Sequence, residues 1–232
     1  MTTDLSAVVL VCSLKKSPAA SSSEKLGREV LEELKSHGVT GGDVIRVVDH
    51  DVRFGVSADE GDGDAWPGIR EKVLAADVLV LATPIWMGLP SAVCKMVLER
   101  LDNEIAETDD DGRPILFGKV AVVAVVGNED GAHNTGAELF GTLSAIGYTI
   151  PAEGKTYWVG EAMQGTDYND LDPAPEKTVG TTKTAARNAA HLAGMLKSTN
   201  YPASETPVEI WADHPRLRSR RRTSGWRAAL VP

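Results

Sequence analysis

The sequence lacks the features that mark secreted, membrane-spanning and nucleic-acid-binding proteins. It has two cysteines in 232 residues, Cys12 and Cys94, and these stand far apart among apolar neighbours. No apolar run reaches the ~18 residues of a membrane helix, and the first residues lack the basic and apolar regions of a signal peptide. The net charge of −9 argues against nucleic acid as a partner. We therefore expect a cytoplasmic protein with two buried thiols rather than a disulfide, and no insertion into a membrane.

Several motifs of nucleotide-binding and metal-binding proteins are missing as well. There is no G-x-x-x-x-G-K-[ST] segment, and Gly61 and Gly63 have neither a strand directly before them nor the third glycine of a dinucleotide-binding fingerprint. No H-E-x-x-H or C-x-x-C occurs. We therefore expect no metal site and no redox-active dithiol.

Short apolar runs alternate five times with segments of helical periodicity. We expect strands at residues 7–12, 43–49, 77–82, 120–126 and 156–159, the last sharing its place with 148–150. We expect helices directly after the serines 21–23 and at 66–75, 90–101, 137–146 and 176–197. Runs that are apolar throughout suit strands buried on both faces, as in a parallel sheet. The pattern predicts a doubly wound, five-stranded, three-layer α/β/α domain over residues 1–198.

The last residues, 199–232, do not continue this pattern. They contain Pro202, Pro207 and Pro215 and then the run R-L-R-S-R-R-R, and their formal charge is +3. Prolines and clustered arginines are poor material for a packed face, so we expect a disordered basic tail. The alternative is a basic arm that lies on the acidic body or on a partner subunit.

The loop after Cys12 combines hydroxyl groups, positive charge and the start of a helix. Such a helix start offers unpaired N–H groups and the positive end of its dipole to a phosphate. The candidate phosphate-binding residues are Ser13, Lys15, Ser21, Ser22 and Ser23. The alternative is that the serines only cap the helix.

Two further loops, after Ala82 and Val126, should meet the first one, because strand-to-helix loops of a parallel sheet leave from one edge. An aromatic ring in the second loop can stack on a planar ligand, and a glycine there lets the backbone approach it. The candidates in these two loops are Pro84, Ile85, Trp86, Met87, Gly88, Gly127, Asn128, Gly131 and His133. Together the three loops suit a mononucleotide with a large heteroaromatic ring. Simpler roles remain for Trp86, as a packing residue, and for His133, as a loop histidine rather than a catalytic acid.

Three of these stretches resemble a known family. S-L-K-K-S-P-x-x-S-S-S at residues 13–23 resembles the phosphate loop of the flavodoxin-like family, in particular of its NAD(P)H-dependent FMN reductase and quinone reductase branch. Residues 76–101 match more specifically, with a strand, T-P-x-[YW], a glycine, and a helix ending in [DE]-R-L. The loop at 127–134 is similar to the family's third flavin loop. The chain departs from the family at Cys12, where a glycine is common, and its third loop lacks the family's usual Gly-Gly run. Segments 102–113 and 161–175 have no clear counterpart role in the family.

The resemblance implies an FMN-dependent oxidoreductase in which NADPH or NADH reduces FMN and FMN reduces a quinone, a flavin or another small electron acceptor. The flavin would supply the chemistry, so no catalytic side chain is required. Two alternatives remain: a flavodoxin-type carrier that docks a redox protein, and a flavin-free module that binds another phosphorylated ligand. We also expect a homodimer or homotetramer, in which segments 102–113 and 161–175 help to cover the flavin.

Overall fold

The computed structural model describes residues 4–203. Strands and helices alternate along the chain as follows: β1 (Ala7–Val11), α1 (Ser22–Ser36), β2 (Asp43–Arg46), α2 (Trp66–Ala75), β3 (Val78–Trp86), β4 (Leu89–Pro90), α3 (Ala92–Leu101), β5 (Val120–Gly127), α4 (Ala132–Ala145), β6 (Lys155–Val159) and α5 (Glu176–Ser198). Short 3-10 helices follow β2, α3 and β6, at Val47–Asp49, Asp102–Ala106 and Tyr168–Asp170.

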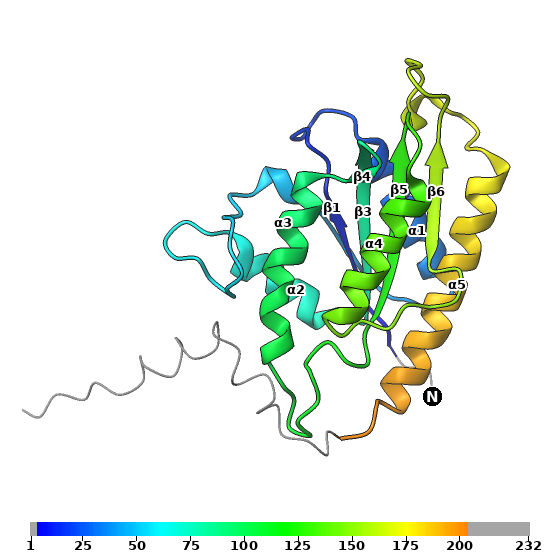
Figure 1. Cartoon of the computed structure of the whole chain (residues 1–232). Helices are drawn as coiled ribbons and strands as arrows, with labels where there is room; N and C mark the ends of the chain where they lie inside the picture. The colour runs from blue at the N-terminus through cyan, green and yellow to red at the C-terminus, as the bar shows by residue number, and fades with distance from the viewer. Residues whose placement is uncertain (1–3, 204–232) are drawn as a thin grey trace, which may run out of the picture.

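Five strands form one parallel sheet in the order β2-β1-β3-β5-β6 (Figure 1). The order reverses between β1 and β3, which is the arrangement of flavodoxin-like sheets. Helices α1 and α5 pack on one face of the sheet, and α2, α3 and α4 pack on the other. The three-layer α/β/α fold expected from the sequence is therefore confirmed.

The apolar runs are continuous because the central strands are buried on both faces. In β1, Val9 packs toward α1 and α5, whereas Leu10 packs toward the opposite helices. Helix α1 lies very close to the sheet, since a Cβ at Gly27 would stand 2.9 Å from Val9 and 3.2 Å from Ala82. The alanines of α5 allow a similar approach, and Ala186 and its neighbours on that face are fully buried. These contacts fix the start of α1 beside the end of β1.

Four element boundaries differ from those expected. Strand β3 continues through Trp86 and pairs with β4 in a short hairpin, where we expected a loop and then a helix beginning at Pro90. Helix α3 starts at Ala92 instead. Ser91 is its N-cap, and the Ser91 hydroxyl accepts the N–H of Cys94. Helix α4 begins at Ala132 rather than at residue 137, because Gly131 turns the chain with a φ of 126°. The second strand ends at Arg46 and is followed by a 3-10 turn.

The described chain continues for five residues beyond α5. The ring of Tyr201 contacts that of Phe117, with centroids 5.3 Å apart, and its hydroxyl lies 2.9 Å from that of Thr149. Residues 199–203 thus lie on the body of the domain, and the rest of the expected basic tail, 204–232, lies outside the described residues. Within residues 4–203, no helix combines the length and the apolar character needed to cross a membrane.

Candidate functional site

A cavity of about 470 Å³ lies at the carboxyl edge of the sheet, where the strand order reverses. All three predicted loops contribute to its lining. The predicted residues that line it are Ser13, Lys15, Ser21, Ser22, Ser23, Pro84, Ile85, Trp86, Gly127 and Asn128. The volume is within the usual range of ~300–1,000 Å³ for small-molecule sites. The topology argument made from the sequence therefore places these side chains together.

Four predicted residues lie beside this cavity rather than in its lining. Met87 and Gly88 form the tip of the β3–β4 hairpin, and Gly131 packs beneath Gly88. The ring of His133 points to another group, since its Nδ1 lies 3.1 Å from the Nζ of Lys155. The geometry gives His133 no part in this cavity, as in the simpler alternative considered above.

The first loop presents hydroxyl groups at the start of α1. Ser21 is the N-cap, and its Oγ accepts the N–H of Glu24 at 3.2 Å. The Oγ of Ser22 accepts the N–H of Asn169 at 3.3 Å. Each hydroxyl still has its own proton to donate, and the first N–H groups of a helix have no partner within it. Capping and anion binding are thus compatible at this helix start.

Arg46, at the end of β2, shapes the first loop from outside it. Its guanidinium donates to the carbonyl oxygens of Ala19 at 2.7 Å and Lys15 at 3.3 Å, and it pairs with Glu24 in the first turn of α1. Burial opposes the ionisation of Glu24, but hydrogen bonds from Arg46 and Arg28 hold its pKa below the ordinary value. Sequence analysis missed Arg46. Its signal was an arginine in the middle of the otherwise apolar part of the expected strand, D-V-I-R-V-V-D at residues 43–49.

A buried hydroxyl pair joins the first loop to the second. The Oγ of Ser91 donates to the carbonyl of Cys12 at 2.7 Å, and the N–H of Ser91 donates to the Oγ1 of Thr83 at 3.1 Å. Cys12 and Cys94 are both free and buried beside this pair. Burial, with Cys94 as a further cause, raises the pKa of the Cys12 thiol well above its ordinary value. This thiol is therefore protonated at neutral pH and poorly nucleophilic.

The end of β6 and the segment after it, part of the stretch 161–175 that we expected to help cover the flavin, form the remaining wall. Trp158, Met163, Asp167 and Asn169 line the cavity there. The segment is fixed at both sides. The Nδ2 of Asn128 donates to Asp167 at 3.2 Å, and Lys25 donates to the carbonyl of Tyr168 at 3.1 Å. The Oδ1 of Asn128 is buried against Gly160, where a Cβ would stand 2.4 Å from it, and it has no hydrogen-bond partner among the described residues.

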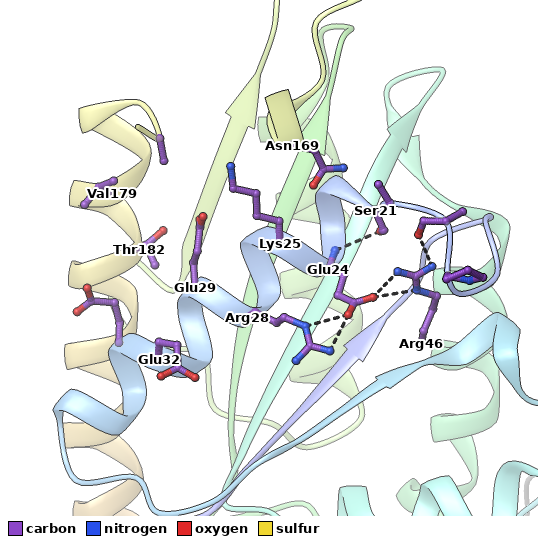
Figure 2. Close-up of a pocket in the computed structure, with 15 residues that line it drawn as sticks. Ser21, Glu24, Lys25, Arg28, Glu29, Glu32, Arg46, Asn169, Val179 and Thr182 are labelled. Atoms are coloured by element: carbon purple, nitrogen blue, oxygen red, sulfur yellow. Dashed lines mark hydrogen bonds and ion pairs between the residues drawn. The ribbon is translucent and has the colours of Figure 1, made fainter. Parts of the chain in front are cut away.

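A second hollow, of about 680 Å³, lies over α1 between the first loop and α5 (Figure 2). Its charged side chains mostly satisfy one another. Glu24 pairs with Arg28 and Arg46, and Lys25 donates to two backbone carbonyls. Glu29 accepts the hydroxyl of Tyr168 at 2.5 Å. These groups have little capacity left for a ligand, so the carboxyl-edge cavity is the better candidate despite its smaller volume.

The carboxyl-edge cavity fits FMN in the kinds of group it offers. Hydroxyls and a helix N-terminus suit the phosphate, and Trp86, which is 51% exposed, offers a ring beside the cavity. Gly127 and Asn128 bring the third loop to the same cavity. Among the described residues, no group of three His, Cys, Asp or Glu side chains is arranged to hold a metal ion.

Comparison with known proteins agrees with this chemistry. The sequence matches the family described as NADPH-dependent FMN reductase over residues 5–164. It is 32% identical to 8-demethyl-8-aminoriboflavin-5′-phosphate synthase of Streptomyces davaonensis, over 85% of this chain and 80% of that protein. It is 35% identical to the divalent metal cation transporter MntH of Mycobacterium bovis over 89% of this chain, which spans 31% of the length of MntH.

A solved structure extends the comparison to the fold. The crystal structure of RosB with bound 8-demethyl-8-formylriboflavin-5′-phosphate superposes with a TM-score of 0.78 and 30% sequence identity, covering 98% of this chain and 91% of RosB. The family model covers well over half of the sequence, and the synthase is matched over most of its length. The chain therefore belongs to the NADPH-dependent FMN reductase family, whose members use FMN with NAD(P)H as the electron donor, as its sequence motifs predicted.

Proposed function

We propose that this chain binds FMN in the carboxyl-edge cavity and uses NADPH or NADH to reduce a small electron acceptor such as a quinone or a flavin. The observation that carries the proposal is the convergence of three loops on one cavity: hydroxyls at the start of α1, the Pro84–Trp86 end of β3, and Gly127 with Asn128 after β5. FMN would supply the hydride and electron transfer. The protein would bind it, orient it and limit the access of water.

The residues divide by the part of FMN they would contact. Ser13, Lys15 and the three serines 21–23 would hold the phosphate, because they lie at the positive end of α1. Trp86 and Pro84 would flank the isoalloxazine ring. Gly127 and Asn128 would border the ring from the third loop.

Flavin content and turnover test this function. The purified protein should be yellow, and it should oxidise NAD(P)H steadily in the presence of a quinone and in the absence of any protein partner. Steady oxidation that requires a redox protein would favour the electron-carrier alternative. A colourless chain that binds no added FMN would favour the flavin-free alternative.

A second candidate is that a riboflavin 5′-phosphate is the substrate and is itself modified. This candidate is favoured by how much of the chain each comparison covers. The structural likeness to RosB covers 98% of this chain, whereas the match to the FMN reductase family ends at residue 164. Mass spectrometry of the flavin after incubation with candidate co-substrates separates the two functions. An unchanged FMN mass throughout turnover supports the first, and a flavin of altered mass supports the second.

The cellular location and the oligomeric state of the enzyme are part of the proposal. We expect a cytoplasmic homodimer or homotetramer, in which the wall formed by residues 161–175 lies near a neighbouring subunit. The support is the exposure of apolar side chains around the cavity, among them Met163 at 98% and Leu14 at 50%. Sedimentation at micromolar protein concentration tests it, and a fully active monomer would refute it.

A further inference from the structure

The β3–β4 hairpin beside the cavity has a turn that its own side chains do not stabilise. Only two residue pairs join its strands, Ile85 with Pro90 and Trp86 with Leu89. The turn residues Met87 and Gly88 both have left-handed backbones, with φ of 54° and 74°. Glycine or asparagine is preferred at such positions, and methionine is unfavourable there. Met87 is also 87% exposed, so its side chain contributes little packing to offset this cost.

The third loop holds this turn in place through the backbone. The two carboxylate oxygens of Glu129 accept the N–H groups of Met87 at 3.1 Å and Gly88 at 3.2 Å. From α4, Asn134 and Thr135 donate to the carbonyl of Gly88 at 3.0 and 3.2 Å. The turn is therefore bonded on both its N–H and its carbonyl sides to a single neighbouring segment.

Gly131 completes the contact by close approach. A Cβ at Gly131 would stand 2.5 Å from the Cα of Gly88, so no side chain fits between the two backbones. Glu129 differs from the other members of this contact because it also lines the cavity, as does Trp86. One carboxylate thus joins the cavity to the turn that directly follows Trp86, one of the two tryptophans in the cavity lining.

We propose that Glu129 is a positioning residue that holds Trp86 against the flavin ring by bonding the N–H groups of Met87 and Gly88. The inference rests on the proposed binding of FMN in this cavity. Hydrogen bonds from N–H groups to a carboxylate are stronger than those to a neutral acceptor. Loss of one bond and of the charge should therefore let the turn relax and move Trp86 away from the ring.

Three variants of the full chain test the proposal. Glu129→Gln removes the charge and leaves only one acceptor oxygen for the two N–H groups. Asp130→Asn makes the same change of charge at the next residue, whose carboxylate accepts the N–H of Gly131 rather than a hairpin N–H. Met87→Asn, added to Glu129→Gln, creates the Asn-Gly sequence that favours this kind of turn without the carboxylate.

FMN titration, with the visible circular dichroism of the bound flavin, is the first readout. Glu129→Gln should raise the Kd for FMN by roughly tenfold, the effect of losing about one such bond, and should change the flavin dichroism. Asp130→Asn should bind as the wild type does, and Met87→Asn should restore most of the lost affinity and the original dichroism. Wild-type binding by Glu129→Gln would overturn the proposal. A double variant as weak as Glu129→Gln would also overturn it, because the loss would then reflect direct contact with FMN.

Hydrogen exchange of the FMN-free protein separates this inference from the proposed function. The amides of Met87 and Gly88 should exchange faster in Glu129→Gln than in the wild type. If they do so although the wild type binds no FMN, the contact is supported and the proposed function fails. Unchanged exchange at both amides would overturn the contact itself.

Discussion

Single side chains outside the first loop decide its shape. Arg46 bonds the carbonyls of Lys15 and Ala19, and Ser91 bonds the carbonyl of Cys12, where the loop begins. Both side chains are buried. Their bonds order the loop before any ligand arrives, which lowers the entropy lost when a ligand binds.

The hydroxyl groups at the start of α1 should matter to FMN binding. Replacing Ser21 and Ser22 by alanine removes up to two hydrogen bonds to a charged acceptor, each worth about 1.5–3 kcal/mol. We expect FMN affinity, measured by fluorescence titration, to fall accordingly. Ser21→Ala also removes the helix cap, at about 1 kcal/mol of stability.

Ser36→Ala is the matched control for this double variant. Ser36 lies at the other end of α1, and its hydroxyl donates to the carbonyl of Glu32. It should leave FMN affinity unchanged. Unchanged FMN affinity in the Ser21→Ala, Ser22→Ala variant would show that these serines do not bind the FMN phosphate.

Trp86 should report directly on a bound flavin. We expect FMN to quench the fluorescence of Trp86, and Trp86→Ala to weaken FMN binding or shift the flavin reduction potential, because the ring loses a stacking partner. Trp158 also lines the cavity, so the quenching that is lost in Trp86→Ala measures the part due to Trp86. If affinity, potential and flavin spectrum are all unaltered in Trp86→Ala, the residue is only a packing residue.

At the scale of elements, the long connection between β2 and α2 depends on one buried ion pair. The Nη2 of Arg100 on α3 lies 2.7 Å from the Oδ2 of Asp64, and both side chains are fully buried. Burial opposes ionisation of Asp64, but the N–H groups of Glu60, Arg53 and Trp66, with the Arg100 guanidinium, lower its pKa to about 2. The pair therefore ties this connection to α3.

This ion pair gives the fold a defined pH dependence. Because the pKa of Asp64 is lower in the folded chain than its ordinary 3.8, its contribution to stability is complete above that pH and is lost as the pH falls toward about 2. Asp64→Asn should lower the free energy of unfolding by about 3 kcal/mol at neutral pH, because it leaves Arg100 buried without a charged partner.

Urea unfolding at neutral and acid pH measures both effects. The difference between the wild type and Asp64→Asn should shrink as the pH falls below 3.8. Asp62→Asn, an exposed change in the same connection, should unfold as the wild type does at every pH. A difference between the wild type and Asp64→Asn that stays constant with pH would contradict the assignment.

The sequence predicts an element well where burial sets its pattern of apolar residues. It predicts an element poorly where a few hydrogen bonds to the backbone decide the structure. Strands β1, β3 and β5 are apolar throughout because both their faces are covered, and the runs reveal them. The T-P-I-W-M-G segment has the proline and glycine of a loop, yet its first part extends β3 and pairs with Leu89 and Pro90. Likewise, the bonds of Arg46 and Glu129 go to backbone atoms of distant loops. No local pattern predicts such bonds.

For the molecule as a whole, the described core should fold without the C-terminal segment. The sheet and its five helices end at Ser198, and residues 199–203 add the contacts of Tyr201. A chain cut after Ala203 should therefore keep its thermal midpoint and its flavin content. A large fall in either would assign residues 204–232 a place in the fold or in the site.

The central claim is that the carboxyl-edge cavity holds FMN and that NAD(P)H reduces it there. Anaerobic titration of the purified protein with NADPH or NADH, followed by its visible spectrum, tests this most directly. We predict about one FMN per chain, whose oxidised absorption is bleached by stoichiometric NAD(P)H and returns when a quinone is added. A chain that retains no flavin and whose added FMN stays free in solution would contradict the account.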